Sequence, residues 1–266
     1  MKLNTTGLII KEQNLDENDK IVTALTKDYG VIKAFAKNAK NIRKSLSTGV
    51  SLLSFSKLDI FVGKESYIIN DAGSIEIFFE LRKDIFKMAM AQYFCELAGA
   101  LCPTDAPANE QLSIILNALH LLCKTDKTPL LIKPCVELRL LCAAGYMPDL
   151  VMCSTCGAYE QKTMHFLPKS GKLCCAECYN KTVFTPEDGT QNYSHANKKT
   201  APEPGVEIDM GIVTALRHIT FVPAAKLFSF ELPQESLVRL NQLTELYLAY
   251  TVQQDFVTLK FLKGCL

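Results

Sequence analysis

The chain has 266 residues, of which 48% are apolar and 21% are charged, and its formal net charge is +1. These values are typical of globular proteins with a substantial core, and the length suggests two domains, or one domain with an appendage. They exclude a globally basic protein, so any binding of nucleic acid must come from a local cationic patch. The N-terminal MKLNTTGLII lacks a signal-peptide pattern, and no segment approaches the ~18 apolar residues of a membrane span. We therefore expect a cytoplasmic protein without a membrane partner.

Residues 1–81 predict a small structure of β-strands. Between the runs lie turn signals such as Tyr29-Gly30, Gly63-Lys64 and Asp71-Ala72-Gly73. Closely spaced strands favour a barrel or a sandwich, because closure removes exposed edges. Periodicity alone does not separate an OB-fold from an SH3-like barrel. The predicted strands are rich in Val, Ile, Phe and Thr and read GLIIK, KIVTALT, VIKAFA, SLLSFSKLDIFV, SYIIND and SIEIFFE.

Residues 82–266 predict a helical domain. Apolar residues recur at three- and four-residue intervals, which indicates amphipathic helices whose apolar sides form the core of a bundle. Pro103 ends the first helix, and Gly145 suits a left-handed cap after the third. Asp209 is a candidate N-terminal cap of a later helix. The expected helices span about 84–102, 109–124, 129–145, 209–220 and 234–252.

A C-x2-C-x18-C-x2-C pattern lies within residues 150–182 and comprises Cys153, Cys156, Cys175 and Cys178. Four thiolates form the closed tetrahedral shell that Zn2+ prefers, and a filled shell leaves no open position for catalysis. We therefore predict a structural zinc site, with a redox dithiol as the weaker alternative.

Two further residues of this segment could enter the site. Cys174 offers a second register, but the CxxC spacing selects Cys175. His165 fits no ligand spacing, and we expect it at the surface.

A cationic segment lies between Tyr29 and Leu58, which contains no acidic residue. A mobile basic surface suits a nucleic-acid backbone, because neutralised phosphates release counterions. Phe35 and Tyr67 are candidates for stacking on bases. The alternative is a solvated basic loop without a partner. The basic residues are Lys33, Lys37, Lys40, Arg43, Lys44 and Lys57.

Common catalytic motifs are absent from the sequence. Walker A, GxGxxG, GxSxG and HExxH patterns do not occur, and the four histidines are dispersed without evident acidic or nucleophilic partners. We therefore expect a binding protein rather than an enzyme.

Four segments of the chain, taken in order, carry a family resemblance: GLIIKEQNLDENDKIVTALTKDYGVIKAFAKNAKN, SLLSFSKLDIFVGKESYIINDAGSIEIF, ELRLLCAAGYMPDLVMCSTCG and LYLAYTVQQDFVTLKFLK. Together they resemble the RecO family of DNA-repair proteins. The resemblance covers nearly the whole chain, and its order is more specific than any single motif. The last segment carries Thr258 where a serine is common in the family.

The resemblance implies an α+β multidomain protein: an OB-fold over 1–81, then an all-α domain over 82–266 with an inserted four-cysteine zinc site. It implies binding of single- and double-stranded DNA, annealing of complementary strands, and loading of RecA onto single strands without ATP hydrolysis. The implied partners are RecR and the acidic C-terminal tail of the single-stranded-DNA-binding protein, and the implied location is the nucleoid. The implied DNA region comprises Lys33, Lys37, Lys40, Arg43 and Lys44.

Two other functions compete with this one. The same residues permit an RNA-binding or ribosome-associated zinc-ribbon protein, for which a preference for RNA over DNA would be diagnostic. A metalloenzyme would require metal-dependent turnover, which a closed four-thiolate shell does not predict.

Overall fold

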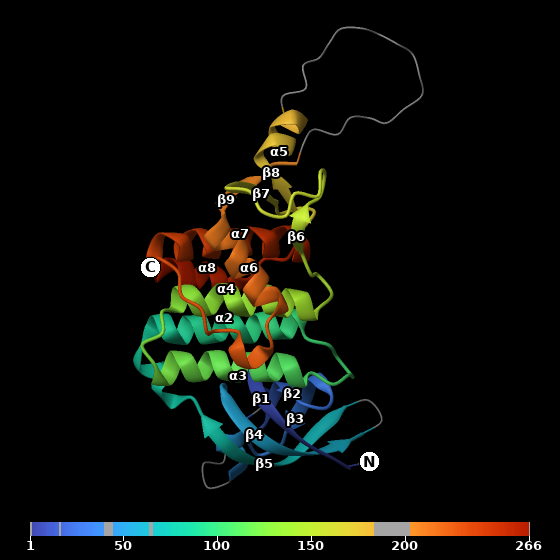
Figure 1. Cartoon of the computed structure of the whole chain (residues 1–266). Helices are drawn as coiled ribbons and strands as arrows, with labels where there is room; N and C mark the ends of the chain where they lie inside the picture. The colour runs from blue at the N-terminus through green and yellow to red at the C-terminus, as the bar shows by residue number, and fades with distance from the viewer. Residues whose placement is uncertain (1, 16, 40–44, 64–65, 184–202, 266) are drawn as a thin grey trace.

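The computed structural model describes residues 2–15, 17–39, 45–63, 66–183 and 203–265. Figure 1 shows an elongated molecule with β1–β5 at one end, a layer of helices in the middle and the cysteine-rich segment at the other end. The expected order of a strand-rich N-terminal part and a mainly helical remainder is confirmed. The domain boundary at residues 81 and 82 stays a prediction.

Five N-terminal strands close into a barrel in the order β1-β2-β3-β5-β4. Neighbouring strands pair antiparallel, except that β3 and β5 are parallel. Alternate residues such as Ile32, Ala34 and Ala36 point into the barrel, where they are buried with Val22 and Ile60. The strands are β1 (Lys2–Asn14), β2 (Lys20–Thr26), β3 (Gly30–Ala36), β4 (Ser54–Val62) and β5 (Tyr67–Ile77).

The predicted turn at Asp71-Ala72-Gly73 is wrong. These residues continue β5, and they pair with β4 from Asp59 to Lys57. The short helix α1 (Ser45–Gly49) lies against this stretch, and a Cβ on Gly49 would meet the carbonyl oxygen of Ala72 at 2.3 Å. Packing against α1 therefore holds the stretch in the barrel despite its turn-like composition.

The five helices expected from the sequence are confirmed. They are α2 (Ile85–Leu101), α3 (Asn109–Lys124), α4 (Pro129–Ala143), α6 (Met210–Phe221) and α7 (Gln234–Val252). The Asp209 carboxylate accepts a hydrogen bond from the Ile212 amide at 2.9 Å, which confirms the predicted cap of α6. Gly145 has φ +93°, as expected of a left-handed cap. Two short 3-10 helices, η1 (Phe79–Lys83) and η2 (Ala224–Lys226), accompany them.

The C-terminal tail forms an additional helix, α8 (Val257–Gly264). Glu96 on α2 caps its first turn, because the carboxylate accepts hydrogen bonds from the amides of Val257 (3.2 Å) and Thr258 (2.9 Å). The Thr258 hydroxyl also donates to Glu96. A serine would supply the same hydroxyl, so the departure from the family pattern at Thr258 preserves this cap.

A sheet of order β6-β8-β7-β9 is built on the cysteine-rich segment, and α5 (Ala176–Val183) lies between β8 and β9 in the chain. The sequence predicts no strands here. Three strands come from the segment itself, and the fourth comes from beyond the polar stretch 184–202, which lies outside the described residues. The strands are β6 (Asp149–Cys153), β7 (Thr163–Leu167), β8 (Lys172–Cys175) and β9 (Val206–Asp209).

The barrel packs directly on the helical layer. Leu8, Ile10 and Leu25 of the barrel belong to the same buried cluster as side chains of α2 and α3. Backbone hydrogen bonds reinforce the contact, from Val31 N to Pro103 O (2.8 Å) and from Ala108 N to Lys27 O (2.9 Å). The β2–β3 hairpin is thereby fixed to the α2–α3 connection.

A charged network is buried between α2, α4 and α7. The Glu137 carboxylate, which is fully buried, accepts hydrogen bonds from the hydroxyls of Tyr93 and Thr244, both at 2.6 Å. Lys133 lies 2.7 Å from it and also contacts Glu245 at 3.3 Å. These contacts satisfy a buried carboxylate that would otherwise carry a large desolvation cost.

Within the described ranges, we find no helix with both the length and the apolar character needed to cross a membrane.

Candidate metal centre and nucleic-acid interface

The four cysteines of the CxxC pairs converge at one point. Their sulfur atoms all lie within 4.8 Å of one another. Cys153 ends β6, Cys156 follows in the turn, Cys175 ends β8 and Cys178 lies in α5. The Sγ atoms of Cys156 and Cys175 are 3.7 Å apart. Tetrahedral coordination with Zn–S bonds of ~2.3 Å requires sulfur atoms ~3.8 Å apart, so the donor set fits zinc.

Backbone amides stabilise negative charge at this cluster. Burial opposes ionisation of Cys153, but hydrogen bonds from the amides of Cys175, Cys156 and Thr155 outweigh it and lower its pKa to about 6. The Cys175 amide lies 3.3 Å from the Cys153 sulfur. Gly157 has φ +75° and donates its amide to the Cys153 carbonyl, which closes the turn of the first pair. The amides thus favour a thiolate at Cys153, the form that binds a metal, whereas burial raises the pKa of Cys175 and hydrogen bonds to the neighbouring cysteines raise that of Cys178.

Cys174 lies outside the cluster, as the CxxC spacing predicts. It is buried, and burial raises the pKa of its thiol to about 11. Cys174 therefore remains a protonated, apolar side chain at neutral pH.

The expectation that His165 lies at the surface is wrong. It lies in β7, between Cys174 on β8 and Glu207 on β9, and only 9% of it is exposed. Its ring stacks on Tyr179 with centroids 4.0 Å apart. Burial lowers the pKa of His165, and the ring packs in the sheet's core outside the cysteine cluster. A central position in the sheet is not apparent from the spacing of the cysteines.

Two of the predicted cationic residues, Lys33 and Lys37, lie exposed on the barrel. Lys33 and Phe35 point outward from β3 because they alternate with buried Ile32 and Ala34. Lys33 on β3 is the strand partner of Thr23 on β2, and Thr23 is in turn the partner of Lys11 on β1. The remaining residues of the implied DNA region, Lys40, Arg43 and Lys44, lie outside the described residues.

Two aromatic rings share this surface. Phe35 on β3 pairs with Ile68 on β5, which pairs with Phe61 on β4. Phe35 is 36% exposed and Phe61 is 41% exposed, so both rings are accessible to a ligand. Tyr67, the other stacking candidate, donates its hydroxyl to Asp105 at 3.2 Å and is engaged with the α2–α3 connection. Phe61 is therefore the second stacking candidate beside Phe35. The alternation of buried and outward residues in SFSKLDIFV could have predicted its outward position.

We call this surface the β3 face and define it as Lys11, Lys33, Phe35, Lys37 and Phe61.

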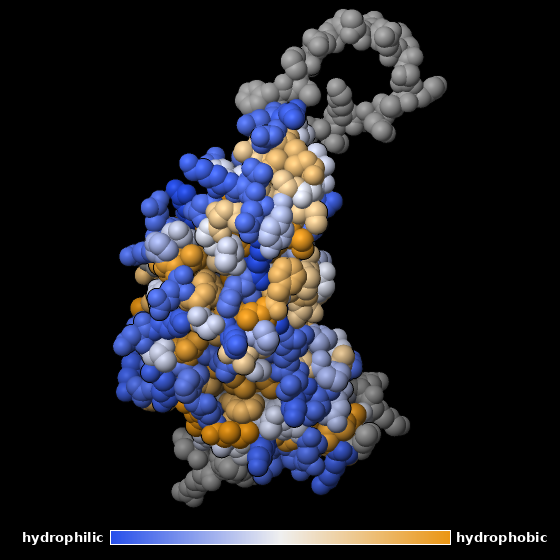
Figure 2. All heavy atoms as spheres, in the orientation of Figure 1, coloured by the Kyte–Doolittle hydropathy of each residue, from blue (hydrophilic) through white to orange (hydrophobic). Residues whose placement is uncertain are grey.

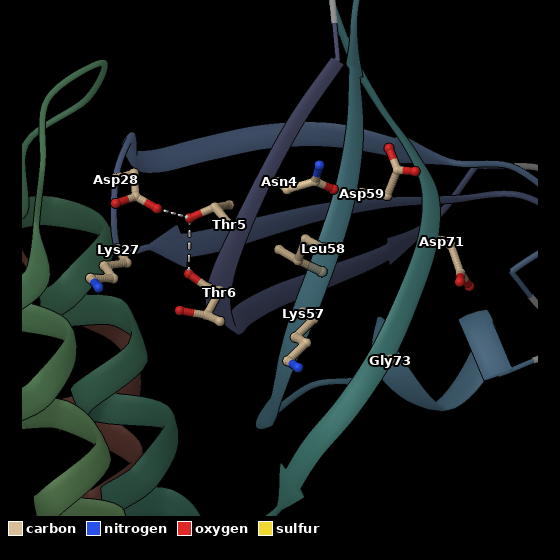
Figure 3. Close-up of a pocket in the computed structure, with 10 residues that line it drawn as sticks. All are labelled: Asn4, Thr5, Thr6, Lys27, Asp28, Lys57, Leu58, Asp59, Asp71 and Gly73. Atoms are coloured by element: carbon tan, nitrogen blue, oxygen red, sulfur yellow. Dashed lines mark hydrogen bonds between the residues drawn. The ribbon is translucent and has the colours of Figure 1, made fainter.

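A hollow lined by β1, β4 and β5 lies elsewhere on the barrel, and its Asp59 is two residues from Phe61 on β4 (Figure 3). Asn4, Asp59 and Asp71 lie side by side across β1, β4 and β5. Together with Asp28, the hollow has three carboxylates against the two ammonium groups of Lys27 and Lys57. Its charge opposes binding of phosphates, so it contrasts with the β3 face.

The helical domain carries an apolar groove between α2, α4, α7 and α8. Lys133 and Lys263 lie at its edge, and both contact Glu245. The two lysines are therefore neutralised by carboxylates of the protein itself. The apolar side chains that line the groove include Phe86, Met90, Leu130, Val238, Leu259 and Leu262.

Comparisons with known sequences cover the whole chain. The family described as "Recombination protein O N terminal" matches residues 1–78, and "Recombination protein O C terminal" matches residues 82–260. A DNA repair protein RecO from Acetivibrio thermocellus is 31% identical over 98% of this chain and 96% of its own length. One from Caldicellulosiruptor bescii is 27% identical over 99% of each chain. One from Symbiobacterium thermophilum is 31% identical over 66% of this chain and 70% of its own.

Proposed function

Because the chain belongs to the RecO family of DNA repair proteins, we propose that it is a recombination mediator that binds single- and double-stranded DNA. It anneals complementary strands and helps load RecA onto single strands coated by the single-stranded-DNA-binding protein. It acts with RecR, in the cytoplasm at the nucleoid. It acts by positioning DNA strands, without ATP hydrolysis or other catalysis.

The observation that carries the proposal is the β3 face. The strand order β1-β2-β3-β5-β4, with β3 and β5 parallel, supports assignment of the barrel to the OB class. OB-folds bind oligonucleotides on the face of strands 2 and 3. Here β3 carries Lys33 and Phe35, and Lys37 follows it directly; Lys11 on β1 and Phe61 on β4 extend this surface onto the neighbouring strands. Lysines neutralise phosphates and the rings stack on bases, a combination that binds single strands without strong sequence preference.

Annealing follows from the same electrostatics. Two complementary strands repel each other through their phosphates, and cationic side chains reduce that repulsion. Holding the strands on one molecule also raises the local concentration of each for the other. Neither effect requires a chemical step.

Zinc has a structural role in this proposal. Cys153, Cys156, Cys175 and Cys178 would hold it, and the ion would cross-link β6, β8 and α5. With all four positions filled by sulfur, the ion supplies folding energy rather than Lewis-acid chemistry.

We place the acidic tail of the single-stranded-DNA-binding protein in the groove between α2, α4, α7 and α8. The groove offers an apolar lining for the tail's hydrophobic side chains and an exposed lysine, Lys263, for its carboxylates. Since Glu245 already pairs with Lys263, the tail must displace Glu245 from it to bind, while Lys133 stays paired with Glu137.

The test is fluorescence anisotropy of labelled single-stranded DNA across a salt series, with RNA of the same sequence as competitor. We expect DNA binding whose affinity falls steeply with salt, because several phosphates are neutralised. Absence of DNA binding at low salt would overturn the proposal. Strong preference for RNA would favour the ribosome-associated alternative.

A further inference from the structure

A second cationic and aromatic surface lies where the barrel meets the helices. We call it the junction surface and define it as Phe79, Arg82, Lys83, Lys87 and Lys124. These residues come from η1, the first turn of α2 and the end of α3. The chain runs through this region from β5 into α2 (Figure 1). Apolar atoms reach the surface near the lower end of the molecule, where the barrel meets the helices (Figure 2).

The aromatic ring of this surface is accessible and already bears a cation. Phe79 is 57% exposed, and the Arg82 guanidinium lies 5.6 Å from its ring centroid. Ile77 and Ile85, which lie before and after Phe79 in the chain, are exposed as well. A ring with a guanidinium over one part of its surface is a platform for a base and its phosphate together.

Most cations of the junction surface lack an acidic partner. Lys83 pairs with Glu80 at 2.8 Å. Arg82, Lys87 and Lys124 make no ion pair within the part of the chain that the structure describes.

The acidic groups nearby are already engaged. Asp84 accepts the amides of Phe86 and Lys87 as the cap of α2. Glu76 lies 4.0 Å from His120. The hydrogen bond and charge of Lys83 lower the pKa of Glu80, and the charge of Lys124 contributes, which places Lys124 beside the same group. The junction surface thus carries four cations beside the carboxylates of Glu76, Glu80 and Asp84, which leaves a small excess of positive charge for a polyanion.

The junction surface is well separated from the β3 face. Ile68, which lies between Phe35 and Phe61, is nine residues from Ile77 along β5. At ~3.3 Å per residue this corresponds to roughly 30 Å along the strand. Two polynucleotides, one bound on each surface, would therefore not compete for the same residues.

We propose that the junction surface is a second binding site for single-stranded nucleic acid, which holds one strand while the β3 face holds the other. This inference rests on the proposed function, because it assumes that the β3 face binds the first strand. Charge complementarity selects a polyanion, and the exposed ring selects one with unstacked bases. An acidic peptide is the competing occupant.

The test uses the full-length protein and two non-complementary oligonucleotides, one labelled with a donor and one with an acceptor fluorophore. Energy transfer between them reports two strands on one particle. The variant combines Phe79→Ala, Arg82→Glu and Lys124→Glu, all at exposed positions. The matched control combines Tyr146→Ala, Lys162→Glu and Lys172→Glu, exposed positions at the other end of the molecule.

We expect the wild type and the control to bind both strands. In the junction variant, the first strand binds within about twofold of wild type, and the second binds at least about tenfold more weakly, as when a stacked base is lost. Annealing then slows to the unassisted rate.

Three outcomes contradict the inference or its premise. If the wild type never takes a second strand, or if the junction variant takes it as well as the control does, the inference is overturned. If the variant instead loses only binding of an acidic peptide, the surface is a protein-docking site. Failure to bind even the first strand would overturn the proposed function itself.

Discussion

Gly30 lies against the backbone of Pro103, where the barrel meets the helices. Gly30 has φ +64°, and a Cβ at this position would lie 2.0 Å from the carbonyl oxygen of Pro103. The same carbonyl accepts the amide of Val31. Only glycine therefore allows the β2–β3 hairpin to reach the α2–α3 connection.

Replacement of this glycine should destabilise the protein. We expect Gly30→Ala to lower the free energy of unfolding by more than about 2 kcal/mol, through left-handed backbone strain and displacement of Pro103. Gly73→Ala is the matched control, since its Cβ would meet nothing within 4 Å. Denaturant unfolding measures both, and equal losses would contradict the account.

The buried network around Glu137 makes a second prediction. Lys133→Met leaves the carboxylate without its cation, and we expect a loss of about 3–5 kcal/mol in unfolding free energy. Adding Glu137→Gln should recover part of that loss, because the residual buried charge is removed. A double-mutant cycle by chemical denaturation checks this. Additive losses would show that the two side chains do not interact.

Sequence patterns predicted the elements whose signals are local. Helices α2 to α4 follow from apolar periodicity, and the convergence of Cys153 with Cys175 follows from paired CxxC spacing. The features that the sequence did not predict depend on residues far away in the chain. Helix α8 depends on a cap from Glu96, which lies more than 150 residues earlier. Burial of His165 depends on β9, a strand supplied from beyond the polar stretch.

Metal content distinguishes the two possible registers of the cysteine cluster. We expect the wild type to contain one zinc per chain, and Cys175→Ser to lose it. Cys174→Ser should retain it, because the Cys174 thiol lies outside the cluster. Elemental analysis of purified proteins measures the ratio. Zinc loss from Cys174→Ser with retention in Cys175→Ser would reverse the assigned register.

A substitution in the groove on the helical domain is expected to strengthen binding of the tail rather than weaken it. Glu245→Gln removes the carboxylate that pairs with the exposed Lys263, while Lys133 stays paired with Glu137, so an acidic tail peptide should bind more tightly, by about threefold or more. Leu259→Asp places a like charge in the apolar lining and should abolish binding. Isothermal titration calorimetry measures both affinities. Weaker binding by Glu245→Gln would place the tail elsewhere.

The most direct test of the central claim compares the lysines of the β3 face with those of the carboxylate-rich hollow. One variant carries Lys33→Glu and Lys37→Glu on the β3 face, and the other carries Lys27→Glu and Lys57→Glu in the hollow of Figure 3. Both change the net charge equally, so long-range electrostatics affect them alike.

Anisotropy of labelled single-stranded DNA across a salt series gives the affinity and the salt slope for each variant. We predict that Lys33→Glu with Lys37→Glu weakens binding at least about tenfold and reduces the salt slope by roughly two, one for each lost phosphate contact. The matched variant should stay within about twofold of wild type. Equal losses in both variants, or no loss in the first, would contradict the claim that the β3 face binds DNA.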